Sequence, residues 1–297
     1  MKKEIVIGSR ESVLAVVQSE MVKQYIEQKN PGLAVRILTM KTTGDQILNQ
    51  PLEKIGGKGL FVKELDRALS EGRSDLSVHS LKDVPMELPL GLPLIACSGR
   101  EDPRDVLVLP EGKTEIDFSK PVGCSSRRRM IQFQRLYPQA QFATIRGNVQ
   151  TRLRKLDEGQ YSATILAAAG LKRLGLEGRI SRYFSTEEMI PAAGQAILAV
   201  QGRAGVDYGF LEGYSDPQAA ACARAERAFV RRLGGDCSTP VAAYAQMEDG
   251  RLRLSALYYS EAAGKILEGK ESAPAGEAQQ LGEKLAERFL AECGGIS

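Results

Sequence analysis

The sequence has few of the residues from which several common kinds of site are built. It contains no tryptophan, one histidine and five cysteines among 297 residues, and no two cysteines form a CxxC pair. We therefore expect neither a structural zinc site nor a disulfide framework, and we predict no metal. A Ser–His or Cys–His catalytic pair would have to use His79 alone.

Long apolar runs and a large excess of one charge are missing as well. The longest apolar stretches, such as residues 163–169, are too short to span a bilayer. The N-terminus begins like a signal peptide, but only Ile5-Val6-Ile7 is apolar, so we predict a first strand and a cytoplasmic protein. The formal net charge of +3 is small, and we expect no nucleic-acid and no membrane partner.

What is present indicates a globular α/β protein. The length favours two domains or three small ones, and the apolar content of 43% is ordinary for such a chain. Alternating strand-like segments lead through glycine turns into helical patterns. The chain is predicted to cross into a second domain near residue 99 and to return near residues 191–200. A hairpin of residues 241–246 and 252–259 with a final helix predicts a small α+β domain.

Basic and hydroxyl residues recur where predicted strands end and helices begin. After the strand at residues 4–7, Arg10 and Ser12 stand where helix N–H groups favour an anion. Arginine at such a point opposes the helix dipole, at a cost of roughly a few tenths of a kcal/mol. Its repetition without an evident acidic partner predicts a cleft for a polyanion, and the alternative is capped helices with solvated arginines. The later members of the set are Ser126, Arg128, Arg129, Arg146, Arg152 and Arg173.

A lysine and an aspartate follow the predicted strand at residues 75–80. Pro85 disfavours helix at Val84, so Lys82 and Asp83 are expected in a turn beyond the carboxyl end of that strand. Ligands of open α/β sheets bind at this edge, which makes the pair a candidate for proton transfer or for stabilising a cation. The alternative is a surface ion pair that contributes little. His79 is predicted to be structural.

Cys237 lies in the segment Gly234-Gly235-Asp236-Cys237-Ser238-Thr239-Pro240. Its neighbours are glycine and small polar residues instead of the aliphatic residues that usually surround a buried thiol. A thiol in this setting can act as a nucleophile or as the attachment point of a covalent group. The alternative is a surface turn with an incidental cysteine.

These motifs together resemble the hydroxymethylbilane synthase family, also called porphobilinogen deaminase, over nearly the whole chain. The matching segments are residues 8–12, 56–61, 79–85, 125–129, 145–148, 168–173 and the cysteine loop. The resemblance implies two periplasmic-binding-protein-like α/β domains joined by crossover segments, plus a small α+β C-terminal domain. We place domain 1 at residues 1–98 and 195–215, domain 2 at 99–194, and domain 3 at 216–297. It also implies a monomer.

The resemblance further implies a covalent dipyrromethane cofactor, held by a thioether to Cys237. Four porphobilinogen units would be added to it with loss of ammonia, and hydroxymethylbilane would be released by hydrolysis, as a step of tetrapyrrole synthesis. Asp83 matches the catalytic aspartate that stabilises the cationic azafulvene-like intermediate. The matched cofactor-binding residues besides Cys237 are Lys82, Ser126, Arg128, Arg129, Arg146, Arg173 and Gln195. The matched substrate-binding residues are Arg10, Ser12, Arg152 and Lys58.

Three positions depart from the family pattern, namely Cys124, Ala196 and Asp236, where threonine, glycine, and glycine or serine are commoner. A different class of function is also open, a non-catalytic hinged protein that binds a small polycarboxylate or another anion. Such a protein would need the cleft but neither Asp83 nor a modified Cys237. A phosphate-ligand enzyme is disfavoured because the chain has no GxxxxGK[ST] loop.

Overall fold

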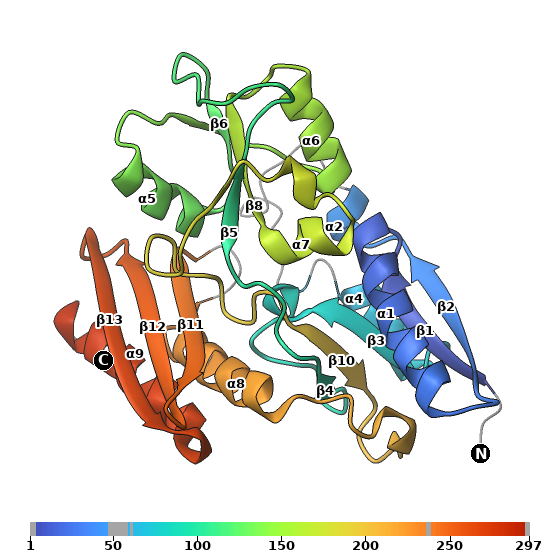
Figure 1. Cartoon of the computed structure of the whole chain (residues 1–297). Helices are drawn as coiled ribbons and strands as arrows, with labels where there is room; N and C mark the ends of the chain where they lie inside the picture. The colour runs from blue at the N-terminus through green and yellow to red at the C-terminus, as the bar shows by residue number, and fades with distance from the viewer. Residues whose placement is uncertain (1–3, 47–58, 60–61, 236–238, 295–297) are drawn as a thin grey trace.

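The computed structural model describes residues 4–46, 59, 62–235 and 239–294, which form three sheets with their helices (Figure 1). Two of the sheets have five strands each and mix parallel with antiparallel pairs. The third sheet has three antiparallel strands. This is the α/β architecture with a smaller α+β unit that the sequence predicts.

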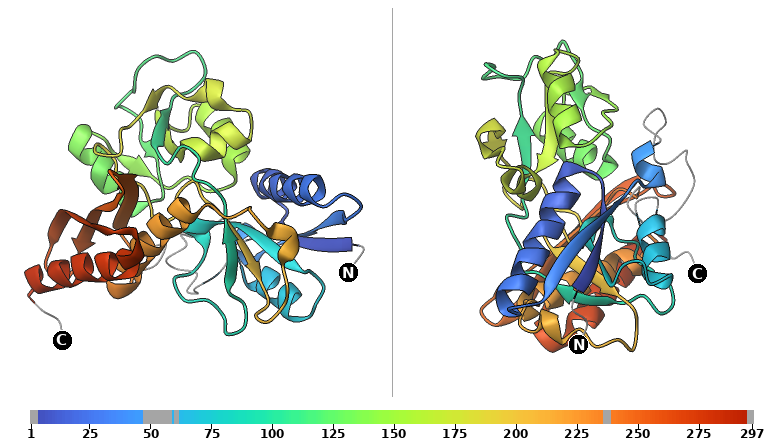
Figure 2. Two further views of the ribbon diagram at one scale, coloured as in Figure 1. Left: turned by 60° about the horizontal axis from the view of Figure 1, so that its bottom comes forward. Right: turned by 90° about the vertical axis from the view of Figure 1, so that its right-hand side faces the viewer.

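The first sheet has the strand order β2-β1-β3-β10-β4. The parallel strands β1, β2 and β3 are joined by β10, which runs antiparallel to both β3 and β4. Helices α1 and α4 lie on opposite faces of this sheet (Figure 2). The elements are β1 (Glu4–Arg10), α1 (Val13–Lys29), β2 (Ala34–Met40), α2 (Thr43–Gln46), α4 (Lys63–Ser70), β3 (Leu76–Ser80), η1 (Leu81–Asp83), β4 (Leu94–Cys97), β10 (Leu198–Gly202) and η3 (Gly209–Leu211).

The second sheet has the order β7-β6-β8-β5-β9. The parallel strands β7, β6 and β8 are followed in the chain by α6, α5 and α7, so the three helices begin at one edge of the sheet. The elements are β5 (Asp105–Val108), β6 (Val122–Gly123), α5 (Arg127–Leu136), β7 (Phe142–Ala143), α6 (Val149–Asp157), β8 (Ala163–Ala167), α7 (Ala168–Arg173), η2 (Glu177–Arg179) and β9 (Arg182–Tyr183).

The third sheet packs on two helices that cross closely. The aromatic rings of Phe229 and Phe289 meet edge to face at 5.5 Å between helices α8 and α9. A side chain at Gly282 would lie 2.2 Å from the carbonyl oxygen of Ala225, so the helices can approach this closely only with glycine there. The elements are α8 (Pro217–Arg232), β11 (Val241–Glu248), β12 (Arg251–Ser260), β13 (Lys265–Pro274), η4 (Ala275–Glu277) and α9 (Ala278–Glu292).

Two crossover segments connect the first sheet to the second, and they run side by side. The Ser98 N–H donates to the carbonyl oxygen of Leu198 at 2.9 Å, and the Glu101 N–H donates to that of Ala196 at 3.2 Å. Ala196 has a φ of 72°, in the left-handed region that few residues other than glycine adopt. Across the described ranges, no helix combines the length and the apolar character needed to cross a membrane.

Candidate functional site

The predicted turn after β3 is present and holds Lys82 and Asp83. The flanking Leu81 and Val84 are buried, and the Leu81 N–H donates to the carbonyl oxygen of Ile197 at 3.0 Å. Between these anchors the Asp83 carboxylate is exposed, whereas Lys82 is half-buried. The fold therefore presents one carboxylate and one ammonium group from a fixed turn at the carboxyl end of a central strand.

Arg128 and Arg129 do have an acidic partner, which corrects the expectation from the sequence. Both arginines are buried, and both bind the fully buried carboxylate of Asp105 at the start of β5, at 2.7 Å each. Arg129 adds a second bond to it from Nε, at 2.9 Å. Burial alone would raise the pKa of Asp105, but the two guanidinium charges outweigh it and hold that pKa well below its usual range.

Gln195 joins this ion cluster to the turn of the first sheet. Its amide nitrogen donates to the carbonyl oxygen of Pro103 at 2.7 Å and to Asp105 at 3.1 Å. Its amide oxygen accepts a hydrogen bond of 3.2 Å from the Lys82 Nζ. The side chain is fully buried, so its contacts here position other residues. A continuous polar chain thus runs from Lys82 through Gln195 to the two arginines.

The pKa of Lys82 reflects the crowding of cations around it. Burial, together with the charges of Arg129 and Arg128, lowers this pKa from 10.5 to about 8, while Asp83 and Asp105 oppose the change. An anion placed among these groups would relieve the repulsion between them.

Two more predicted arginines lie in the same region, at the start of α6. Arg152 donates from Nε to the carbonyl oxygen of Gly147 at 2.9 Å. Burial, together with the charges of Arg129 and Arg146, lowers the pKa of Arg152 to about 10, while Asp83 opposes the change. Burial also lowers the pKa of Arg146. The structure therefore brings together residues that lie far apart in the sequence, Lys82 and Gln195 being separated by 113 positions.

The predicted serines occupy the N-cap positions of two helices. Ser126 precedes α5 without a side-chain capping bond, and Ser12 accepts a hydrogen bond of 3.4 Å from the Ala15 N–H in α1. Arg10 ends β1, and its charge contributes to the lowered pKa of His79. His79 is buried and its Nε2 contacts the Gln201 amide oxygen at 3.1 Å, as expected of a structural residue.

Arg173 lies in the short helix that the sequence predicts after residues 168–170. It is in the last turn of α7, and it donates to the carbonyl oxygen of Ala196, the residue next to Gln195, at 2.7 Å. Its Nε is buried and has no hydrogen-bond partner within the part of the chain that the structure describes. Burial lowers the pKa of Arg173. Arg173 therefore holds a crossover segment and keeps one donor for another acceptor.

Cys237, Lys58 and the unusual Asp236 lie outside the described residues, so their predicted roles stay predictions. Asp105 is a residue that sequence reasoning missed. The available signal was an acidic residue directly before the apolar run Val106-Leu107-Val108, which forms the buried strand β5.

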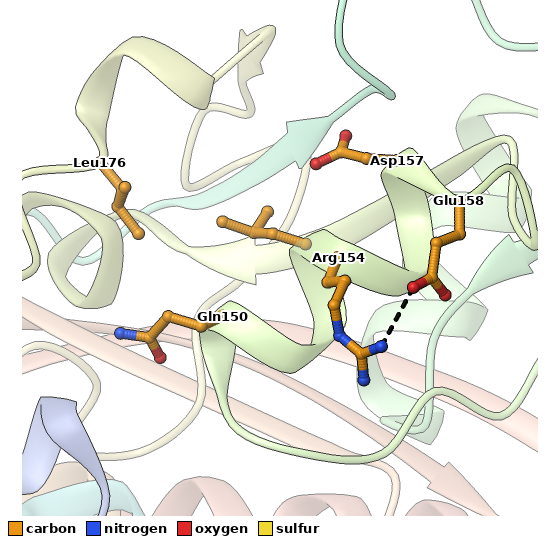
Figure 3. Close-up of a pocket in the computed structure, with 6 residues that line it drawn as sticks. Gln150, Arg154, Asp157, Glu158 and Leu176 are labelled. Carbon is orange, nitrogen blue, oxygen red and sulfur yellow. Dashed lines mark hydrogen bonds and ion pairs between the residues drawn. The ribbon is translucent and has the colours of Figure 1, made fainter.

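A surface hollow of about 510 Å³ is lined by residues of α6 and by Leu176 (Figure 3). Its charged groups already pair, since Arg154 binds Glu158 at 3.0 Å and Asp157 binds Arg179 at 2.7 Å. None of its lining residues belongs to the predicted site, and we assign it no function. The lining residues are Gln150, Leu153, Arg154, Asp157, Glu158 and Leu176.

Comparison with known proteins agrees with the resemblance seen in the motifs. The family model described as "Porphobilinogen deaminase, dipyromethane cofactor binding domain" matches residues 5–208, and that of the "Porphobilinogen deaminase, C-terminal domain" matches residues 220–291. The periplasmic aliphatic sulphonate binding protein SsuA from Escherichia coli is 12% identical, with a TM-score of 0.38 over 78% of this chain and 70% of that one.

The curated relatives are much more similar, and they match over almost their full length. The porphobilinogen deaminase of Ruminiclostridium cellulolyticum is 52% identical over 97% of this chain and 98% of that protein. The enzyme of the same name from Acetivibrio thermocellus is 51% identical over the same shares of each chain. That from Alkaliphilus oremlandii is 56% identical over 86% of each. With both family models and these relatives in agreement, the chain belongs to the porphobilinogen deaminase family.

Proposed function

We propose that this protein polymerises four porphobilinogen units, with loss of ammonia, onto a covalently bound dipyrromethane and releases hydroxymethylbilane by hydrolysis. The observation that carries the proposal is the cluster around Lys82 and Arg152, whose pKa values are lowered by burial to about 8 and about 10. Cations in this state favour a bound anion, and each pyrrole of the substrate carries two carboxylates.

The residues present fit a dipyrromethane bound through its carboxylates. Lys82 supplies a half-buried cation, and the buried Nε of Arg173 is a donor without a partner among the described residues. Ser126, Arg128, Arg129 and Arg146 complete the proposed binding set, while Gln195 holds Lys82 in place. When bound through Cys237, the cofactor supplies the pyrrole carbon to which the first substrate unit is joined.

Asp83 is the proposed catalytic residue. As ammonia leaves the substrate, positive charge develops on the substrate pyrrole, and a carboxylate fixed nearby stabilises it. The C–N bond of the substrate's aminomethyl group would break as ammonia leaves, and a C–C bond would form between that methylene carbon and a pyrrole carbon of the bound chain, which would lose its proton. Arg10, Ser12, Arg152 and Lys58 are proposed to bind the carboxylates of the incoming unit.

We also propose the domain boundaries that the family resemblance implies. Domain 1 comprises residues 1–98 and 195–215, domain 2 residues 99–194, and domain 3 residues 216–297. The grouping of strands supports this division, because β10 (Leu198–Gly202) returns to the first sheet after the whole second sheet has been formed. The monomeric state and the cytoplasmic location stay predictions, and light scattering from the purified protein checks the first.

Intact mass and turnover test the proposed function together. The purified protein should carry extra mass equal to two linked pyrroles, and Cys237→Ser should not. Asp83→Asn should keep that mass while turnover of porphobilinogen falls at least about 100-fold, the loss typical of removing a charge-stabilising group. Glu87→Gln is a matched control, because Glu87 is an exposed carboxylate in the same loop, and its turnover should stay within about twofold.

The anion-binding alternative makes the opposite forecast. If the wild-type mass stays unmodified even after incubation with porphobilinogen, the protein binds anions without catalysis. Full turnover by Asp83→Asn would instead remove Asp83 from the mechanism while leaving the cofactor assignment intact.

A further inference from the structure

Helix α8 of the third unit contacts the loop that follows Asp83. Arg227 on this helix donates from one guanidinium nitrogen to the carbonyl oxygen of Val84 at 3.1 Å. Its other terminal nitrogen reaches the carbonyl oxygens of Pro85 at 2.6 Å and Met86 at 3.4 Å. One side chain therefore binds three consecutive carbonyl groups, beginning at the residue next to Asp83.

Apolar packing holds the same turn against the same helix. Leu81 and Val84, which flank the Lys82–Asp83 pair, share one buried cluster with Ala219 and Ala223 of α8. Apolar contacts of this kind fix a distance but leave sliding and rotation open, because they have no direction. The guanidinium fork adds direction, since its hydrogen bonds are satisfied in one orientation of the loop only.

The bonds of Arg227 are made to neutral groups. Across the described part of the chain no carboxylate lies within ion-pair distance of it, and burial lowers its pKa. Placing a half-buried cation on backbone oxygens stabilises a protein less than pairing it with an acid would. The contacts of Arg227 with three carbonyl groups are suited to holding the loop.

We propose that Arg227 is a positioning residue that holds the Asp83 turn on the helix preceding the Cys237 loop. Helix α8 ends at Arg232, five residues before Cys237 in the sequence. The proposal rests on the proposed function, in which Asp83 and Cys237 serve one reaction. Because displacement of a reacting group by about 1 Å costs on the order of 100-fold in rate, a loosened turn would slow turnover without removing any group that touches substrate.

The test compares Arg227→Gln, Arg227→Lys and Arg224→Gln as purified holoenzymes, with rates normalised to the fraction that carries the cofactor by intact mass. We expect Arg227→Gln to keep the cofactor and to lower kcat about 10- to 100-fold, with KM within about twofold. The kcat of Arg227→Lys should lie between those of Arg227→Gln and the wild type, because an ammonium group keeps the charge but lacks the forked donors of a guanidinium group. Arg224 is exposed on the same helix, and Arg224→Gln should stay within about twofold of the wild type.

A second background separates positioning from a general structural role. If Arg227 acts through Asp83, Arg227→Gln should slow an Asp83→Glu enzyme by less than about threefold, because the carboxylate is already displaced there. An undiminished effect in that background would overturn the proposal, as would a normal kcat in Arg227→Gln. If Arg227→Gln does not fold, the same comparison with Arg227→Lys decides. Failure of the proposed function appears separately, as absence of product from the wild type and from Arg224→Gln.

Discussion

The charged side chains of Asp105 and Lys82 differ in the partners that surround them. Asp105 is surrounded by two arginines and an amide, so its own charge is compensated, while the two arginines share one carboxylate. Lys82 has only the Gln195 amide oxygen within hydrogen-bonding distance among the described residues, and its pKa is lowered to about 8. Asp105 therefore fixes the positions of Arg128 and Arg129, whereas the destabilised Lys82 favours an added anion.

The single histidine gives a pH-dependent stability that can be measured without interference from other imidazoles. Burial lowers the pKa of His79 from 6.5 to about 4, so the unfolded chain binds a proton that the folded chain does not between these pH values. Stability should therefore fall as the pH drops from 6.5 to 4, by up to roughly 3 kcal/mol from this group. Urea unfolding at a series of pH values measures the loss.

The control for this prediction is His79→Gln, which can still contact Gln201 but does not titrate. Carboxylates contribute to acid sensitivity in both proteins, so only the difference between them reports the imidazole. The difference should grow between pH 6.5 and 5. An imidazole NMR signal that titrates above pH 6 in the folded protein would contradict the prediction.

At the scale of helices and strands, short-range patterns were enough to locate the turns but not the contacts between them. Pro85 predicts the turn that follows β3, and Gly8 with Ser12 predicts the turn that follows β1. Strand β13 gave no such signal, because it is an edge strand in which only Ala273 is buried. The partner of Arg128 and Arg129 was also hidden, since Asp105 meets them only through tertiary packing.

The backbone conformation of the crossover segment at Ala196 is fixed by hydrogen bonds from neighbouring residues. Its φ is 72°, and its carbonyl oxygen accepts hydrogen bonds from Arg173 and from the Glu101 N–H, so the peptide cannot relax easily. A β-branched residue tolerates this conformation poorly. Ala196→Val should lower the free energy of unfolding by about 2 kcal/mol or more, measured by urea denaturation.

Ala196→Gly provides the control, because glycine adopts this φ without strain. Its relief of strain is offset by the buried methyl group that is lost and by the greater entropy of the unfolded chain, so its net change should stay within about 1 kcal/mol. Equal stability of the valine variant and the wild type would mean that the segment shifts to another conformation.

At the scale of the whole molecule, one carboxylate ties the three units together. Glu226 of α8 is fully buried and binds Arg100 of the first crossover segment at 2.6 Å. It also accepts hydrogen bonds of 2.7 Å from the Gly194 N–H in the second segment and the Ala245 N–H in β11. Arg100 in turn donates to the carbonyl oxygen of Gln195 at 3.0 Å. The third unit is thus joined to the crossover region by groups buried from water.

Glu226→Gln should uncouple the third unit from the rest of the molecule. The amide keeps the shape, but its NH₂ group cannot accept a bond and the Arg100 charge stays buried without a counterion. Breaking a buried pair from one side costs about 3 to 5 kcal/mol, so calorimetry should show a lower first transition that is separate from the main one. Glu287→Gln, which removes an exposed partner of Arg232, should change stability by less than about 1 kcal/mol. A single unshifted transition in Glu226→Gln would mean that apolar packing alone joins the units. If the unpaired Arg100 charge causes the loss of stability, the double variant Glu226→Gln with Arg100→Met should recover part of that loss.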